Sequence, residues 1–328
     1  MPSPTLFLEV DPLDRPMVTG QFPDAEVRSE ALSGAELINA CQGKEAVCCF
    51  IYSKFTKEVI EALPDLKLLC TRSVGYNHID IAACRAHGIT VCNVPDYGSH
   101  VIAEHVFALL LSALRHVTEG DSKVESGNFD YHGLRGMALM GKTIGIVGTG
   151  KIGFCVAKIA HGFGMRILAV DKCRIVELEA VYGVKYVDLD TLYKESDILT
   201  LHVPALPDTM HMIDAKAIGS MRSGVIIVNT ARGELIDSTA LLEALESGKV
   251  ARALLDVLEH EQDFQLNEKL IRHKNVIVTP HIAFYADDST TRMFLESLYS
   301  IHQWQWKEKV THEVKPPTVV CDLPGVKK

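Results

Sequence analysis

The stretch Gly145-Ile-Val-Gly-Thr-Gly-Lys-Ile-Gly153 contains Gly148, Gly150 and Gly153 in the spacing G-x-G-x-x-G. The apolar run Lys142–Val147 predicts a strand before it, and Ile152–Phe163 predicts a helix after it. Arg166–Val170 predicts the next strand, and Asp171 follows it, 18 residues beyond Gly153. A glycine turn between a strand and a helix, with an acid after the next strand, is typical of a dinucleotide-binding site.

Each of these residues has a physical role in such a site. Gly148 permits the tight turn, Gly150 lets backbone N–H groups approach a pyrophosphate, and Gly153 lets the helix pack closely on the strand. The pyrophosphate would lie at the positive N-terminus of the helix. Asp171 would accept hydrogen bonds from the adenosine ribose and repel a 2′-phosphate, which favours NAD over NADP, although Lys172 and Arg174 weaken that preference. A turn without a ligand is the alternative.

The order of predicted elements indicates an α/β fold with two domains. A chain of 328 residues exceeds what one core usually serves, and strands that alternate with helices predict parallel sheets. The predicted strands are Thr5–Val10, Ala46–Tyr52, Leu66–Thr71, Thr90–Asn93, Lys142–Val147, Arg166–Val170, Ile198–His202, Val225–Asn229, Ala253–Val257 and Val276–Val278. The predicted helices include Lys57–Ala62, Asp80–His87, Ser99–Val117, Ile152–Phe163, one capped by Asp237 and running through Leu245, and Thr290–Trp306; the tail after Pro316 looks irregular.

Composition argues against several classes of function. The net charge of −9 and the lack of a Lys/Arg run argue against a nucleic-acid partner. The N-terminus has no basic region of a signal peptide, and no segment approaches the ~18 uncharged apolar residues of a membrane helix. Nine scattered cysteines form no CxxC pair, so we expect no metal site, reduced thiols and a cytoplasmic protein.

Three polar residues follow later strands. Arg232 follows Val225–Asn229, Glu261 follows Ala253–Val257, and His281 follows Val276–Val278. Ligands of open α/β sheets bind outside the carboxyl ends of the strands. A proton donor, a carboxylate to orient it and a cation for an anionic substrate would meet there, as hydride transfer requires.

Seven motifs between Ser73 and Tyr285 give the chain a resemblance to a known family. They are SVGYNHID, VPDYGSHVIAEH, VGTGKIG with Asp171, LHVPALPDT, NTARGELID, LLDVLEHE and TPHIAFY. In this order they resemble the D-isomer-specific 2-hydroxyacid dehydrogenases. The HIAFY ending and the PDY triplet are most similar to the D-lactate dehydrogenase branch.

The resemblance implies two Rossmann-like parallel-sheet domains. A flavodoxin-like substrate domain, residues 1–98 and 286–328, would be split by an inserted NAD-binding domain, residues 99–285. The helix from Ser99 would carry the chain across and the last helix would carry it back. The active site would lie in the cleft between the domains.

The resemblance also assigns roles to residues. His281 would be the catalytic acid/base, Glu261 the carboxylate that stabilises its imidazolium form, and Arg232 the cation that binds the substrate carboxylate. Glu259 is an alternative to Glu261, which could also belong to a solvated acidic loop. Arg232 could instead pair with Glu234 or Asp237.

Further residues match substrate and cofactor positions. Substrate-binding positions are Ser73, Val74, Gly75 and Tyr97, with Phe284 and Tyr285 as residues that shape the pocket. Tyr97 could instead be a plain turn aromatic, and the two later aromatics could be core. Asp256 would hold the nicotinamide carboxamide, and the other cofactor-binding positions are Lys151, Ile152, His202, Val203, Pro204, Thr209, Thr230, Ala231, Arg232 and His281.

The expected function is reversible hydride transfer between NADH and a small 2-oxo acid, with pyruvate and D-lactate as the favoured pair. Two alternatives stay open: an NAD(H)-responsive corepressor-like binding protein, and a dehydrogenase of the same fold for formate, phosphite, phosphoglycerate or another small acid. The apolar helix Ser99–Val117 matches a region that forms a two-fold dimer in the family, so we expect a homodimer.

Overall fold

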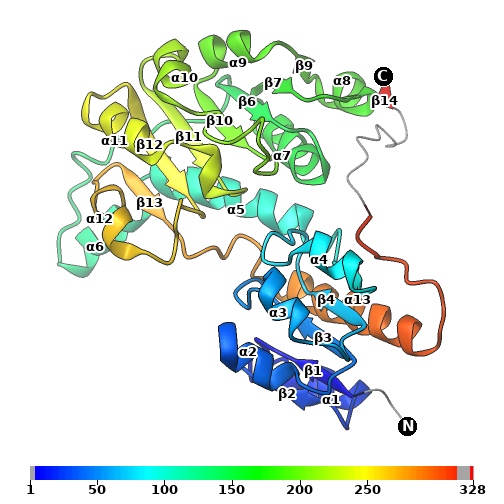
Figure 1. Ribbon diagram of the computed structural model, residues 1–328. Coiled ribbons are helices and arrows are strands. Elements are labelled where there is room, and N and C mark those ends of the chain that lie inside the picture. Colours follow the sequence, from blue (N-terminus) through cyan, green and yellow to red (C-terminus); the bar gives the residue numbers. More distant parts are fainter. Residues whose placement is uncertain (1–3, 316–325, 328) are drawn as a thin grey trace. The chain divides into compact units, whose positions relative to one another are not determined.

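The computed structural model describes residues 4–315 and 326–327, which divide into two compact units (Figure 1). Unit 1 contains the described residues up to Gly98 and those from Ala286 to 315. Unit 2 contains Ser99–Tyr285 and residues 326–327. The predicted boundaries put all of 286–328 in the first domain. The structure differs because β14 (Val326–Lys327) pairs antiparallel with β8 (Arg174–Ile175) of unit 2.

Unit 1 is built on a five-stranded parallel sheet in the order β2-β1-β3-β4-β5. This is the flavodoxin-like strand order, as predicted. The strands are β1 (Thr5–Phe7), β2 (Glu26–Val27), β3 (Ala46–Cys49), β4 (Leu68–Thr71) and β5 (Thr90–Cys92). The helices are α1 (Arg15–Gln21), α2 (Gly34–Cys41), α3 (Lys57–Glu61), α4 (Ile81–Ala86) and α13 (Asp287–Gln305).

Both faces of the unit 1 sheet are buried. In β3, Val47 and Cys49 join a core with α2, α3 and α4, whereas Ala46 and Cys48 join a core with α1 and α13. A strand buried on both faces is apolar at every position. The burial explains why Ala46–Cys49 has no alternation of polar and apolar residues.

Unit 2 is built on a seven-stranded parallel sheet in the order β13-β12-β11-β10-β6-β7-β9. The strands are β6 (Thr143–Val147), β7 (Arg166–Val170), β9 (Lys185–Tyr186), β10 (Ile198–Leu201), β11 (Val225–Asn229), β12 (Val250–Leu255) and β13 (Val276–Val278). The helices are α5 (Ser99–Leu114), α6 (Val117–Glu125), α7 (Lys151–Gly162), α8 (Val176–Tyr182), α9 (Leu189–Glu195), α10 (Ala215–Ser220), α11 (Ser238–Glu246) and α12 (Phe264–Ile271), with the 3₁₀ turn η1 (Gly233–Leu235).

Helices cover both faces of the unit 2 sheet. Ile226 and Val228 of β11 pack on the side of α5, α7 and α8, whereas Val225 and Ile227 pack on the side of α9, α10, α11 and α12. The chain leaves β6 toward β7 and β9, then returns to β10 on the other side of β6. This reversal is the topological switch point at which doubly wound sheets bind nucleotides.

The single long helix expected over Ser99–Val117 is two helices. α5 ends at Leu114 and α6 starts at Val117, with a bend of 54° between them and His116 in the left-handed conformation (φ 52°). Eight α5 side chains are buried, seven of them in the core of unit 2, which accounts for the helix's apolar character. No single helix among the described residues is long and apolar enough to span a membrane; α5 and α6 meet that test only as a bent pair.

Six cysteines are buried free thiols: Cys41, Cys48, Cys49, Cys70, Cys84 and Cys92. Burial raises the pKa of Cys41 and Cys84 to about 12 and keeps such groups protonated. They act as small hydrophobes, as expected. Cys173 is disulfide-bonded, so the expectation of reduced thiols is wrong at that residue.

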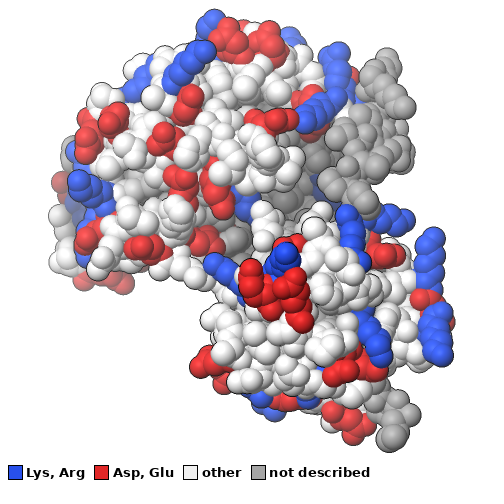
Figure 2. Space-filling model, viewed as in Figure 1, with Lys and Arg blue, Asp and Glu red and all other residues white. Residues whose placement is uncertain are grey.

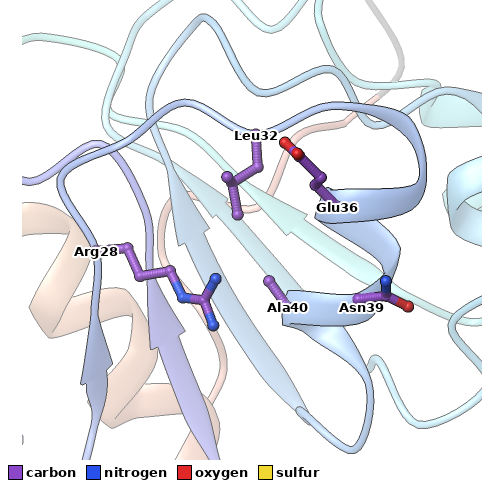
Figure 3. Close-up of a pocket in the computed structure, with 5 residues that line it drawn as sticks. All are labelled: Arg28, Leu32, Glu36, Asn39 and Ala40. Carbon is purple, nitrogen blue, oxygen red and sulfur yellow. The ribbon is translucent and has the colours of Figure 1, made fainter.

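A surface pocket of about 440 Å³ lies in unit 1 beside α2 (Figure 3). Arg28 and Leu32 line it from the segment that follows β2, and Glu36, Asn39 and Ala40 line it from α2. Arg28 is already paired with Glu26. On the face that Figure 2 displays, acidic and basic side chains are interspersed over the surface.

Candidate active site

The residues predicted for the site in unit 2 follow the carboxyl ends of its parallel strands. Gly148 follows β6, His202 follows β10, Thr230 follows β11, Asp256 follows β12 and His281 lies three residues beyond β13. These strands are neighbours in the sheet. Because parallel strands end at one edge, the fold brings all five residues to the same edge.

The glycine turn has the shape that a dinucleotide requires. Gly148 has φ 91°, and a Cβ on it would lie 2.6 Å from the carbonyl oxygen of His202. A Cβ on Gly153 would lie 2.0 Å from the carbonyl oxygen of Gly148, so α7 packs directly on the turn. A Cβ on Gly150, the N-cap residue of α7, would meet no atom within 4 Å. The helix N-terminus is therefore open to a pyrophosphate and fits NAD.

Asp171 is fixed by neighbouring donors. Its Oδ2 accepts from the backbone N–H of Thr149 at 2.5 Å and from Thr149 Oγ1 at 3.1 Å, and its Oδ1 accepts from the N–H of Cys173 at 2.9 Å. Arg174 pairs with Glu179 at 2.8 Å and lies over the ring of Tyr186. The guanidinium is thus engaged by other groups, which strengthens the case for NAD over NADP.

His281 and Glu261 form a carboxylate–imidazole pair. His281 Nδ1 lies 3.1 Å from Glu261 Oε1 and 3.2 Å from Oε2. A carboxylate at Nδ1 fixes the imidazole so that Nε2 is the atom that exchanges a proton. Glu259, the alternative carboxylate, contacts His211 instead.

Asp256 holds the turn that carries His281. His281 is itself left-handed (φ 55°), and its N–H lies 2.9 Å from the carbonyl oxygens of Asp256 and Thr279. The Asp256 carboxylate accepts from Thr279 Oγ1 at 2.5 Å, Ile282 N at 2.9 Å and Ala283 N at 2.8 Å. Asp256 is 1% exposed, so in this structure its carboxylate serves the histidine turn.

Sequence analysis missed two side chains of this network. Thr279 was assigned no role, and His105, whose Nε2 lies 3.1 Å from Thr279 Oγ1, was also left without one. The threonine precedes the Pro-His pair in TPHIAFY, which is a usable signal. His105 is 174 residues away, and no sequence pattern connects it to Thr279.

Arg232 has no carboxylate partner in the described part of the chain. Its Nη1 donates to the neighbouring carbonyl of Ala231 at 2.6 Å. Asp237 caps α11 by accepting from the N–H groups of Thr239 and Ala240, as its predicted N-cap role requires. The structure therefore does not support the alternative in which Arg232 merely pairs with Glu234 or Asp237.

The other predicted cofactor positions differ in their surroundings. Thr230 Oγ1 is buried and has no hydrogen-bond partner among residues 4–315 and 326–327. Thr209 Oγ1 closes its own loop, donating to the carbonyl of Pro204 and accepting from the N–H of Leu206. Desolvation lowers the pKa of His202 to about 3, so its imidazole is neutral near pH 7. Lys151, Ile152, Val203 and Ala231 are all at least partly exposed along the same edge.

In unit 1, the loop after β4 presents backbone donors. The carbonyls of Ser73, Val74 and Gly75 accept from Val94 N, Asn93 Nδ2 and Ser73 Oγ. The N–H groups of Val74 and Gly75 have no acceptor within the described residues. Such free N–H groups suit a carboxylate.

The aromatic positions are distributed between the units. Tyr97 is 7% exposed in unit 1. Phe284 and Tyr285 form an edge-to-face pair with ring centroids 5.8 Å apart, and Tyr285 is 56% exposed. Tyr285 is therefore not a core residue.

Comparison with known proteins agrees with this geometry. Residues 107–283 match the family model described as D-isomer specific 2-hydroxyacid dehydrogenase, NAD binding domain. The chain is 38% identical to the hydroxypyruvate reductase of Thermotoga maritima, over 89% of this chain and 95% of that one. It is 35% identical to the D-lactate dehydrogenase of Escherichia coli, over 85% and 88%. The structure of D-lactate dehydrogenase from Aquifex aeolicus, complexed with NAD and lactic acid, matches with a TM-score of 0.87 at 33% identity, over 96% of this chain and 100% of that chain.

These comparisons, together with the dinucleotide turn and the carboxylate–imidazole pair at one sheet edge, identify the chain as an NAD-dependent oxidoreductase. The chain belongs to the D-isomer-specific 2-hydroxyacid dehydrogenase family.

Proposed function

We propose that this protein interconverts a small 2-oxo acid and its D-2-hydroxy acid, with pyruvate and D-lactate as the preferred pair. The observation that carries the proposal is the His281–Glu261 pair, with the aromatic residues Phe284 and Tyr285 three and four residues after the histidine. Two flat side chains this near the acid/base in the chain suit a short apolar substituent such as a methyl group.

The proposed roles follow from the chemistry of each group. Protonated His281 donates from Nε2 to the carbonyl oxygen, and Glu261 stabilises the imidazolium before transfer. Arg232, with no carboxylate partner in the described structure, binds the substrate carboxylate through its planar fork. In unit 1, the N–H groups of Val74 and Gly75 suit a carboxylate. When bound, NADH supplies the hydride that the carbonyl carbon accepts.

The cofactor proposal uses the same sheet edge. The turn Gly148–Gly153 receives the pyrophosphate, Asp171 receives the adenosine ribose, and Thr230 Oγ1 offers a buried hydroxyl without a partner in the described structure. Lys151, Ile152, His202, Val203, Pro204, Thr209 and Ala231 line the path between them in this proposal. Asp256 acts on the nicotinamide end through the His281 turn.

The test is NADH oxidation against pyruvate, 2-oxobutyrate, phenylpyruvate, hydroxypyruvate and glyoxylate, with NADPH in parallel. Fastest turnover on pyruvate supports the proposal. Preference for hydroxypyruvate, the substrate that the name of the Thermotoga maritima relative implies, would keep the mechanism and change the substrate. NADH binding without turnover on any acid would favour the corepressor-like alternative.

We also propose that the protein is a cytoplasmic homodimer. The reason differs from the one expected, because α5 is buried within unit 2. The homodimer proposal is supported instead by exposed apolar side chains in the segment that follows α5: Val117, Val124, Phe129, Tyr131 and Met140.

A further inference from the structure

Glu259, two residues before Glu261, is held by a histidine from another loop. Glu259 Oε1 lies 2.5 Å from His211 Nε2, and Glu259 Oε2 accepts from the N–H of Ser238 at 3.2 Å. The Glu259 side chain is 19% exposed and that of His211 is 45% exposed. Both carboxylate oxygens of Glu259 are thus engaged by donors from outside its own loop.

The loop at residues 256–263, called here the β12 loop, is anchored at its other end by α12. Asn267, 4% exposed, directs Nδ2 to the carbonyl oxygens of Glu259 at 2.7 Å, His260 at 3.3 Å and Asp263 at 3.2 Å. Glu261 lies between these anchored residues. Its position relative to His281 therefore depends on how the β12 loop is held.

The β12 loop also packs against the residue after Arg232. A Cβ on Gly233 would lie 2.0 Å from the carbonyl carbon of Leu258 and 2.4 Å from the nitrogen of Glu259. The two backbones are in direct contact, so a shift of Glu259 changes the spacing between Arg232 and Glu261.

His211 closes the loop at residues 202–212, called here the β10 loop. It is left-handed (φ 47°), and its N–H donates to the carbonyl of Glu234 at 2.8 Å. Thr209 and Val203, two of the proposed cofactor contacts, lie in the same loop. The His211–Glu259 contact joins the β10 loop to the β12 loop.

The charges of the two groups favour this contact. Desolvation opposes the charged form of Glu259, but hydrogen bonds from His211 and Ser238 outweigh it and hold its pKa below the ordinary value. The hydrogen bond to Glu259 raises the pKa of His211 against desolvation, and Asp237 and Asp214 act in the same direction. Between the lowered pKa of Glu259 and the raised pKa of His211, the two groups therefore form an imidazolium–carboxylate ion pair.

We infer that His211 and Glu259 are positioning residues that set the β12 loop, and with it Glu261, relative to the β10 loop and its cofactor contacts. In the described part of the chain, neither side chain contacts Glu261 or His281, so neither takes part in proton transfer. The inference rests on the proposed function only where the experiment measures turnover of a 2-oxo acid.

The experiment compares His211→Ala, His211→Gln and Glu259→Gln in the full chain, measuring kcat, KM for pyruvate and the NADH dissociation constant. His211→Ala is expected to lower kcat by ~10- to 10²-fold, because a misplacement of catalytic groups by ~1 Å can cost ~10²-fold, and to weaken NADH binding. His211→Gln places an amide nitrogen near the position of Nε2 and is expected to recover most of both losses. His211→Ala combined with Glu259→Gln should be no worse than His211→Ala, because each removes the same contact.

His116→Ala is the matched control. His116 is also left-handed (φ 52°), and its Nδ1 lies 3.5 Å from Glu119 Oε1, but it begins α6 and carries no site residue. It should leave kcat and NADH affinity unchanged.

Three results would overturn the inference: a folded His211→Ala variant with wild-type kcat and NADH affinity, equal losses in His211→Ala and His211→Gln, or failure of His211→Gln to fold, which would make the pair purely structural. If the wild type reduces no 2-oxo acid, the proposed function fails separately. The NADH affinity of His211→Ala then decides the inference.

Discussion

In the proposed reaction, His281 and Glu261 are the residues on which proton transfer depends most directly. His281→Ala removes the proton donor and is expected to lower kcat by ~10²–10⁴. Glu261→Gln keeps a polar side chain beside His281 Nδ1, 3.1 Å away in the wild type, but removes the negative charge, so kcat should fall less than in His281→Ala. Steady-state kinetics with NADH and pyruvate measure both. NADH binding should persist in each variant, and near-normal turnover of His281→Ala would contradict the assignment.

Asp171 is the residue that should set coenzyme choice. Asp171→Gly removes a fixed negative charge from the place of a 2′-phosphate, and the ratio of kcat/KM for NADPH over NADH is expected to rise about tenfold or more. Asp190→Asn, which removes an equal charge from an exposed pair with Lys194, is the control and should leave the ratio unchanged. An unchanged ratio in Asp171→Gly would show that Asp171 does not face the ribose.

Individual side chains show how far sequence reasoning reaches. Arg232, Glu261 and His281 could be proposed from the sequence because each follows a predicted strand, and parallel strands end at one edge. His105, His211 and the contact between Gly233 and Leu258 were not found, since each depends on backbone positions that only the folded chain brings together. The choice between Glu259 and Glu261 as the partner of His281 needed the distances in the structure, in which Glu261 contacts His281 and Glu259 contacts His211.

At the scale of the element, the packing of α7 on the glycine turn requires a residue without a Cβ at position 153. Gly153→Ala would place a methyl group 2.0 Å from the carbonyl oxygen of Gly148, so the turn or the helix must move, at a cost of ~1–3 kcal/mol in the free energy of unfolding. NADH affinity should fall as well, because the same turn receives the pyrophosphate. Gly162→Ala, in the last position of α7 with no atom within 4 Å of its Cβ, should instead be neutral or stabilising. Chemical denaturation and NADH titration of both variants provide the measurement, and equal effects would contradict the steric argument.

The junction between the β10 and β12 loops predicts a pH dependence of stability. The pKa of His211 is raised above 6.5. Its contribution to the free energy of unfolding is therefore complete below pH 6.5 and is lost as the pH rises through the raised pKa. The contribution of Glu259, whose pKa is lowered below 4.5, is complete above pH 4.5 and is lost as the pH falls through the lowered pKa. The difference in Tm between wild type and His211→Gln should be largest between pH 4.5 and pH 6.5. It should shrink as the pH rises through the raised pKa of His211 or falls through the lowered pKa of Glu259. A difference that grows toward alkaline pH would reverse the sign and exclude the pair.

Element boundaries were predicted best where strands are buried and helices are capped by side chains. β7, β11 and β13 have their predicted bounds, and Asp237 caps α11 as expected. The break between α5 and α6 was missed because His116 carries no sequence signal for the left-handed conformation that glycine usually adopts. Short edge strands such as β2 and β9, two residues each, were also beyond periodicity arguments.

At the scale of the whole molecule, the alternation of strands and helices predicted parallel sheets, and the family resemblance implied their flavodoxin-like and Rossmann-like architectures. Unit 1 has the flavodoxin-like order and unit 2 the Rossmann order with one further strand, β13. The β14–β8 pairing was not foreseen, because two residues far from the rest of their sheet give no pattern. The proposed self-association also belongs to this scale, and it would depend on surfaces that neither core uses.

The exposed apolar segment after α5 carries the prediction of a dimer. α6 buries none of its side chains in the unit, and Phe129, Tyr131 and Met140 beyond it are 82%, 76% and 79% exposed. Side chains of this size cost free energy in water at ~25 cal/mol per Å² of apolar surface, so a second copy of the chain that covers them is favoured. Sedimentation of the wild type at micromolar concentration should give twice the mass of one chain, and the double variant Phe129→Ser, Tyr131→Ser should sediment as a single chain. Leu13→Ser, which removes an equally exposed apolar side chain (85%) from unit 1, should remain a dimer. A monomeric wild type would exclude the dimer, and a dimeric double variant would place its interface elsewhere on the chain.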